Sequence, residues 1–151
     1  MSGTEVHVGR IVSLEQGRDG WRLALDDGGS LQADAAAPSF PFWSRLVQVS
    51  RRYGWPVYAR CRPAGQVRVL LPASVYTVAQ LRPDPNGEGL RVAFYESHAL
   101  HLLRGSRPDH DQLKERLQEA RRTGRRLVVT ESPRQPEIVD VRFDEPPAAR
   151  A

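Results

Sequence analysis

The feature that most constrains this chain is a pattern that occurs twice. Residues 38–71 and residues 108–141 align at an offset of 70 positions. The positions that coincide are prolines, a glycine and a pair of arginines: Pro38 with Pro108, Arg51-Arg52 with Arg121-Arg122, Gly54 with Gly124, and Pro63 with Pro133. Residues of this kind recur for reasons of backbone geometry. The pattern therefore predicts an internal duplication.

The duplication extends toward the N-terminus of each half. Residues 75–82 echo residues 6–12, and residues 89–96 match residues 20–27 at an offset of 69. The change of offset falls in predicted turns, where insertions are tolerated. We expect repeat 1 over residues 1–72, repeat 2 over residues 73–144, and a disordered tail over residues 145–151.

Repeat 1 shows strand and helix patterns in a clear order. Trp21, Leu23 and Leu25 alternate with polar residues, which is typical of a half-buried strand. Ser39 is a favourable N-cap, because its hydroxyl can accept from free N–H groups of the first turn, and Gly54 is a favourable helix end. The pattern predicts a helix over residues 40–53 and strands over residues 6–14, 21–26, 30–33, 57–62 and 67–71.

Repeat 2 follows the same order. Asp109 and Gln112 form a capping-box pattern, which predicts that a helix begins here. The helix is expected over residues 109–123, and strands over residues 75–82, 89–96, 97–101, 126–131 and 137–143.

Fold class follows from this order of elements. We expect an α+β protein that is mainly β, in which each repeat reads strand–strand–strand–helix–strand–strand. This is the order of the five-stranded OB-type barrel, so two small OB-like barrels are expected. The alternative is one pseudo-twofold domain, in which both repeats close a shared sheet or barrel carrying two helices.

Composition limits the classes of function. The chain has 22 basic and 18 acidic residues, a net charge of +4 and a pI near 9.8, and Lys114 is its single lysine. Arginine suits bidentate contacts to phosphate. The single Cys61 excludes an internal disulfide and a cysteine-based zinc site. We see no signal-peptide pattern and no apolar run of membrane-spanning length, so a cytoplasmic protein without membrane contact is expected.

A basic sheet face in repeat 1 is the first candidate site. Its members are predicted to lie opposite the apolar positions of their strands, and Trp55 follows the helix as a second aromatic. Arginines for phosphates and aromatic rings for base stacking favour single-stranded or structured nucleic acid. The residues of this candidate site are Arg22, Trp55, Tyr58, Arg60, Arg62 and Arg68.

A protein-interaction surface is the alternative. Phe42 and Trp43 crowd the beginning of the first helix, where core packing does not require every aromatic ring. Val128 and Ile138 are predicted on the outer face of repeat 2, where they would form an apolar edge. These four residues would support a protein partner or self-association.

No catalytic or metal motif is evident. His98 and His101 are three apart, and on a strand such positions point to opposite sides, so no metal or other cofactor is expected. Cys61 is predicted to point inward as a small core residue. No nucleophile elbow and no phosphate-binding glycine loop is present. The sequence therefore predicts a binding protein and not an enzyme.

Overall fold

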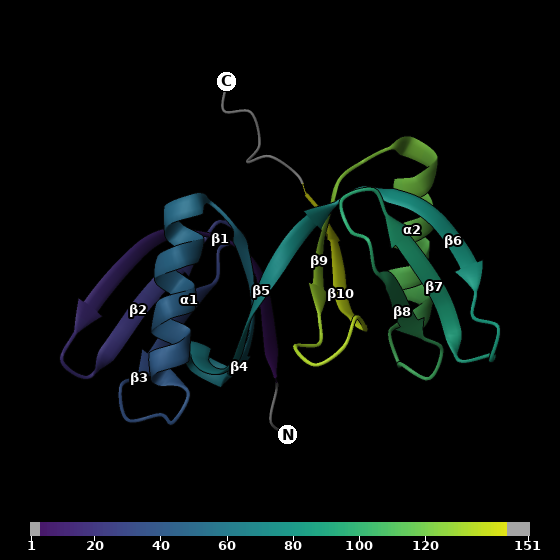
Figure 1. Cartoon of the computed structure of the whole chain (residues 1–151). Coiled ribbons are helices and arrows are strands. Elements are labelled where there is room, and N and C mark those ends of the chain that lie inside the picture. Colours follow the sequence, from purple (N-terminus) through teal and green to yellow (C-terminus); the bar gives the residue numbers. More distant parts are fainter. Residues whose placement is uncertain (1–3, 145–151) are drawn as a thin grey trace. The chain divides into compact units, whose positions relative to one another are not determined.

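The computed structural model describes residues 4–144 (Figure 1). These residues form a mainly β protein with two α-helices, as the sequence predicted. The chain divides between Ala73 and Ser74 into two compact units, called unit 1 and unit 2 below. The tail predicted over residues 145–151 lies outside the described residues.

The described residues of unit 1 contain five strands and one α-helix. The helix has the predicted bounds, and the strands agree with their predicted positions, although β1 and β5 are longer. The last three residues of β5 fall in unit 2. The elements are β1 (Glu5–Gly17), β2 (Gly20–Leu25), β3 (Ser30–Asp34), α1 (Phe40–Tyr53), β4 (Pro56–Arg62), a short 3₁₀ turn (Pro63–Gly65) and β5 (Gln66–Tyr76).

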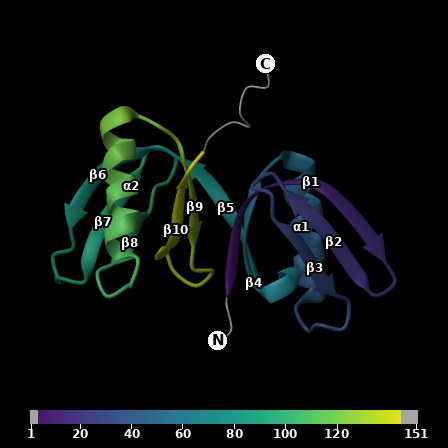
Figure 2. The same ribbon diagram turned by 180° about the vertical axis from the view of Figure 1, so that it is seen from behind.

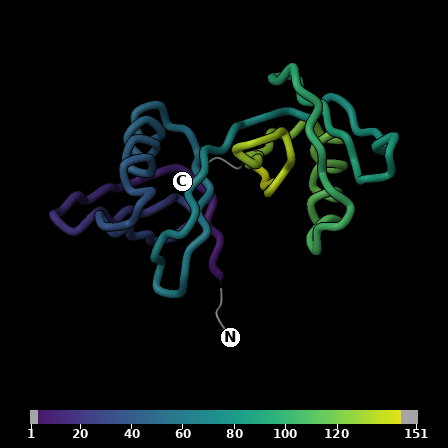
Figure 3. Tube along the Cα trace, turned by 60° about the horizontal axis from the view of Figure 1, so that its bottom comes forward, coloured from purple at the N-terminus to yellow at the C-terminus, as the bar shows by residue number. Residues whose placement is uncertain are grey.

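The strand pairings of unit 1 form a closed ring. β1 pairs with β2 and with β4, β2 pairs with β3, and β4 pairs with β5, all antiparallel. The ring is completed in parallel orientation, where Gln32 of β3 lies beside Gln66 of β5. Figure 3 shows the turn between β1 and β2 extending away from α1. Because the ring is closed, alternate side chains of each strand point to a common interior.

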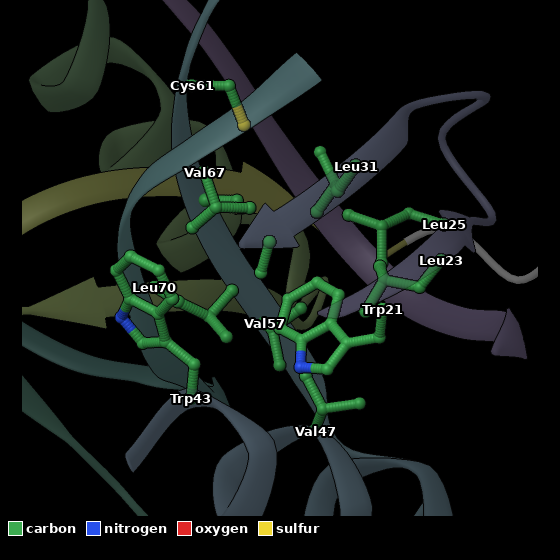
Figure 4. Packing of buried hydrophobic residues seen from close by; sticks show 12 residues of the cluster. Trp21, Leu23, Leu25, Leu31, Trp43, Val47, Val57, Cys61, Val67 and Leu70 are labelled. Carbon is green, nitrogen blue, oxygen red and sulfur yellow. The ribbon is translucent and has the colours of Figure 1, made fainter. Parts of the chain in front are cut away.

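The interior of unit 1 is filled by side chains from β2 to β5 and from α1. Figure 4 shows Trp43 and Val47 pointing from α1 toward Trp21 and the neighbouring strands. Trp43 is only 7% exposed, whereas the adjacent Phe42 is 59% exposed. The interpretation of Trp43 as part of a protein-binding surface is therefore corrected, because its ring is buried in the core. Burial of such a ring stabilises the core by about 2 kcal/mol or more.

Unit 2 repeats the order of elements found in unit 1. Its helix packs on its strands (Figure 2) through Leu113, Leu117 and Ala120, which are buried. The elements are β6 (Val78–Pro83), β7 (Gly89–Phe94), β8 (Leu100–Arg104), α2 (His110–Thr123), β9 (Leu127–Glu131) and β10 (Ile138–Phe143).

Two strand predictions in unit 2 are corrected. The strand predicted over residues 75–82 is interrupted at Thr77, whose backbone N–H and hydroxyl both donate to Glu96. The strand predicted over residues 97–101 begins only at Leu100, because residues 98 and 99 form a bend. A local side-chain hydrogen bond gives the backbone an alternative to the strand ladder.

The last two strands of each unit pair in matching registers. Cys61 lies opposite Val67 in unit 1, and Glu131 lies opposite Ile138 in unit 2. The sequence offset between corresponding residues is therefore 70 from β4 to β9, but 71 from β5 to β10. Both pairs contain a register shift one step further along the ladder.

This extra residue corrects the prediction for Ile138. A shift of one residue moves a side chain to the opposite face of a strand. Ile138 corresponds to the buried Val67 and not to Arg68, and it is 0% exposed in the core of unit 2. It does not form part of an outer apolar edge.

Two glycines have the same backbone constraint in both units. Gly20 begins β2 with φ +140°, and Gly89 begins β7 with φ +146°. A Cβ atom would lie 1.8 Å from the carbonyl oxygen of Ala33 at Gly20, and 2.1 Å from that of Leu103 at Gly89. Neither position can accept a side chain without moving the neighbouring strand.

The helix ends agree with prediction better than the helix starts. Gly54 and Gly124 end the two helices in the left-handed conformation, with φ of 71° and 76°. Ser39 and Asp109 occupy the N-cap positions, but neither makes a side-chain capping bond. The predicted capping interactions are therefore wrong, and the Asp109 carboxylate accepts instead from Arg107, at 2.8 and 3.1 Å.

Candidate nucleic-acid interface

Four polar side chains lie in one row across the outside of unit 1. Arg22 of β2 is paired with Gln32 of β3, Gln32 with Gln66 of β5, and Gln66 with Arg62 of β4. All four residues are exposed. Strands in a sheet are about 4.8 Å apart, so the row spans about 14 Å. Two guanidinium groups therefore flank two amide groups.

Two further arginines extend the row on β4 and β5. Arg60 is two residues before Arg62, and Arg68 is two residues after Gln66, so each lies on the same face as its neighbour. Both are exposed. The structure therefore brings four predicted arginines to one connected outer surface, called the arginine face below and defined by Arg22, Arg60, Arg62 and Arg68.

The arginine face is not neutralised by carboxylates. Within residues 4–144, none of its four arginines forms an ion pair, and Arg60 donates only to the Tyr58 hydroxyl, at 3.4 Å. Glu15 lies opposite Arg22 in the pairing of β1 with β2, without an ion pair. These guanidinium groups keep their hydrogen-bonding capacity for a ligand.

The two predicted stacking residues are placed differently from the arginines. Tyr58 is 4% exposed, so its ring faces are closed to a base, and the expectation of an open aromatic on this face is corrected. Trp55 is 50% exposed and stacks on Tyr53, with ring centroids 5.2 Å apart. At about 3.3 Å per strand residue, however, Trp55 lies about 23 Å from Arg62. It belongs to a separate exposed aromatic pair.

A hollow of about 690 Å³ lies beside the row, and Arg22, Gln32 and Gln66 all line it. The turn between β1 and β2 forms its rim, and Glu15, Asp19 and Asp34 bring carboxylates there. Arg18 and Arg22 line the same hollow, so its charges are mixed, whereas Arg60, Arg62 and Arg68 on β4 and β5 are not among its lining residues. This arrangement can separate an anionic backbone from neutral, hydrogen-bonding groups.

The equivalent elements of unit 2 form a second hollow, of about 280 Å³. Its cations are paired: Arg91 donates to Asp84 at 2.6 Å, and Arg104 contacts Glu137 and lies 3.8 Å from Glu88. The hydrogen bond from Arg91 lowers the pKa of Asp84, and the N–H groups of Glu88 and Asn86 act in the same direction. The charges of this hollow are satisfied within unit 2.

The position of Val128 does not support an apolar edge on unit 2. Its counterpart at an offset of 70 is Tyr58, and both side chains are buried outside the core clusters. Of the four residues predicted for protein interaction, only Phe42 presents its side chain to solvent.

Cys61 is inward-facing and 0% exposed, as its alternation with polar residues predicted. Burial raises the pKa of its thiol to about 11, and the nearby Glu5 and Asp27 act in the same direction. The thiol is therefore protonated at neutral pH and has little nucleophilic character.

Sequence reasoning missed the surroundings of His101. It is buried, Nδ1 contacts the Glu131 carboxylate, and Nε2 lies 2.9 Å from the Ser97 hydroxyl. No short motif joins these three residues. The available signal was the predicted repeat, because His101 aligns with Leu31 and Glu131 aligns with Cys61 at an offset of 70.

Comparisons with protein-family models, curated proteins and solved structures find no match to this chain. Among the described residues, no helix is long and apolar enough to cross a membrane. The same residues contain no cluster of three or more histidine, cysteine or acidic side chains that could hold a metal ion.

Proposed function

We propose that the chain consists of two OB-type barrels that arose by duplication of one unit. Several observations support this. The order of elements is the same in both units, the β3–β5 bridge of unit 1 has a counterpart between Leu102 and Glu137, and the glycine pairs share their backbone conformations. OB-type barrels bind ligands on the face of their second and third strands, with the loops after the first and fourth strands. The hollow of unit 1 lies at these elements.

Unit 1 is a non-catalytic binding module for single-stranded nucleic acid in this proposal. The observation that carries it is the unpaired arginine face beside two exposed glutamines. A cationic groove follows a phosphate backbone, and amide groups can hydrogen-bond base edges. Phosphates would lie along Arg60, Arg62 and Arg68, and bases would extend toward Gln32 and Gln66. Tyr58 and Trp55 have no stacking role at this face.

The binding should depend steeply on salt. Phosphate contacts release counterions, and for single strands each contact contributes about 0.7 to the slope of log affinity against log salt. Three arginine contacts, from Arg60, Arg62 and Arg68, would give a slope of about −2. Fluorescence anisotropy of the full chain with a labelled single-stranded DNA, and with the matching RNA, measures this slope directly. Absence of binding at low salt, or equal affinity at low and high salt, would contradict the proposal.

Protein interaction is the second candidate, and it is favoured by one specific observation. Three aromatic side chains on α1 or just after it are at least half exposed, namely Phe42, Tyr53 and Trp55. Exposed aromatics of this kind are common in protein interfaces. In this alternative the chain self-associates or binds a protein partner without nucleic acid. Analytical ultracentrifugation of the parent chain and of Phe42→Ser tests the alternative. If both sediment as monomers, self-association is excluded.

A further inference from the structure

His101 replaces a core leucine of unit 1. Leu31 lies opposite Leu23 in the pairing of β3 with β2, and His101 lies opposite Val92 in the pairing of β8 with β7. Leu31 is 0% exposed and His101 is 2% exposed. The imidazole packs against Phe94, with ring centroids 5.0 Å apart. An imidazole in this apolar position is costly unless its polar atoms are satisfied.

Both ring nitrogens of His101 have partners from other elements. Nδ1 contacts the carboxylate of Glu131 at the end of β9, and Nε2 lies 2.9 Å from the hydroxyl oxygen of Ser97, which precedes β8. Glu131 stands where unit 1 has the buried Cys61. Unit 1 therefore has a leucine and a cysteine at these two positions. Unit 2 has His101 and Glu131 there, which together with Ser97 form a hydrogen-bonded polar trio.

For a neutral imidazole, the contacts of His101 favour one tautomer. The backbone N–H of Ala99 donates to the Ser97 oxygen at 3.2 Å, so the hydroxyl hydrogen of Ser97 is available for the Nε2 lone pair. A carboxylate oxygen only accepts, so Nδ1 carries the ring hydrogen toward Glu131. The imidazole is thereby oriented as a base toward the serine hydroxyl.

We infer that Ser97, His101 and Glu131 form a catalytic triad for acyl transfer in unit 2. A nucleophile, a base within hydrogen-bond reach and a third group that orients the base are the defining arrangement of such sites. The chain order differs from familiar triads, but the arrangement recurs on unrelated folds and is recognised by geometry. This site is separate from the arginine face and does not depend on its function.

The surroundings of Ser97 suit a small acyl ester. Ser97 is half-buried in a surface connection, beside the exposed Tyr95. Leu100, directly before His101, is 55% exposed and offers apolar surface near this connection. The backbone N–H of His98 has no partner among the described residues. As the N–H that follows the nucleophile, it can stabilise the negative oxygen of a tetrahedral intermediate.

The reaction balances within these residues and one water molecule. Ser97 Oγ bonds to the ester carbonyl carbon while its proton moves to His101 Nε2. The tetrahedral intermediate then collapses, the bond to the alcohol oxygen breaks, and the alcohol leaves with that proton. Water attacks the acyl-serine and gives a proton to Nε2, and the acid departs as Ser97 regains its proton. Glu131 stabilises the imidazolium at each stage.

The test combines covalent labelling with ester turnover by the full chain. A fluorophosphonate probe should label one residue, identified as Ser97 by mass spectrometry, and p-nitrophenyl acetate should be hydrolysed faster than in buffer. Ser97→Ala should abolish the labelling and reduce turnover to the buffer rate. Ser106→Ala, which removes an exposed serine of the same unit, should retain both. Labelling elsewhere, or turnover that survives Ser97→Ala, would overturn the inference.

Two further variants separate catalysis from a packing role. His101→Ala should lose turnover by about 10²–10⁴-fold, and added imidazole should restore part of it, which a packing defect would not allow. His101→Leu with Glu131→Cys recreates the core pair of unit 1, so it should remain folded and be inactive. A parent chain that neither reacts with the probe nor hydrolyses the ester would show that the trio is only structural.

Discussion

Units 1 and 2 share the order of their strands and helix but differ in pairing and in surface, since β1 pairs with β4 in unit 1 whereas β6, β7 and β8 form a separate three-stranded sheet in unit 2. Arg22 in unit 1 and Arg91 in unit 2 occupy equivalent positions, opposite Gln32 and Leu102. Arg22 has no carboxylate partner within the described residues, whereas Arg91 is held by Asp84. Strands in the same order can therefore present either available or satisfied cations. Binding by electrostatic attraction is expected only where the cations are available.

The interiors of the two units also differ, and here unit 2 carries the distinctive polar groups. Unit 1 is apolar at Leu31 and Cys61, and unit 2 is polar at His101 and Glu131. Polar groups that interrupt an otherwise apolar core are expected at functional positions. In our two proposals, ligand binding therefore belongs to the outer surface of unit 1, and chemistry belongs to the polar trio of unit 2.

The largest expected effect concerns the core of unit 1. Trp43→Ala should reduce the free energy of unfolding by about 3–5 kcal/mol, because it removes a buried aromatic ring. The neighbouring Phe42→Ala should change it by less than about 0.5 kcal/mol, since that ring is exposed. Urea unfolding of both variants measures the difference. Equal losses would show that the two side chains share one environment.

A smaller, matched effect is expected at the helix ends. Gly54→Ala and Gly124→Ala should each cost about 1–2 kcal/mol, because a side chain disfavours the left-handed conformation. The added Cβ atom has open space at both positions, so the conformational cost acts alone. Thermal unfolding of both variants should show similar losses. A clear loss in one variant and none in the other would break the equivalence of the units.

The smallest effect depends on pH and distinguishes the two hollows. Arg91 lowers the pKa of Asp84, so ionised Asp84 contributes stability that is complete above the unfolded pKa of about 3.9. This contribution is lost as pH falls through the lower pKa of the folded state. The stability difference between the parent chain and Asp84→Asn should therefore be constant near neutral pH and shrink in strong acid. A difference that grows on acidification would exclude the Arg91 ion pair as its cause.

Backbone signals explain why so much of the fold could be predicted. Gly54 and Gly124 fixed the helix ends, and the alternation at Trp21, Leu23 and Leu25 assigned the core side of β2. Ile138 was misplaced because a one-residue insertion before β10 leaves no signal in composition, although it reverses the face of the strand. Burial of Tyr58 could not be predicted either, because its position alternates correctly with inward-facing residues.

The candidate sites were predictable to different degrees. The arginine face follows from strand alternation, since Arg60 and Arg62 are on one side of β4 whatever the tertiary fold. The row through Gln32 and Gln66 could not be predicted, because it requires the parallel contact between β3 and β5. The trio of Ser97, His101 and Glu131 comes from β8, the connection before it and β9, and only knowledge of the fold brings these residues together.

The central claim is that nucleic acid binds to the arginine face of unit 1. The most direct test compares two double variants. The first carries Arg60→Ala and Arg62→Ala. The second carries Arg51→Ala and Arg121→Ala, and so removes the same charge from the two helices. Anisotropy titrations of single-stranded DNA at several salt concentrations should show a slope smaller by about 1.4 and affinity about tenfold weaker for the first double variant only. Equal changes in both double variants, or no change in the first, would contradict the claim.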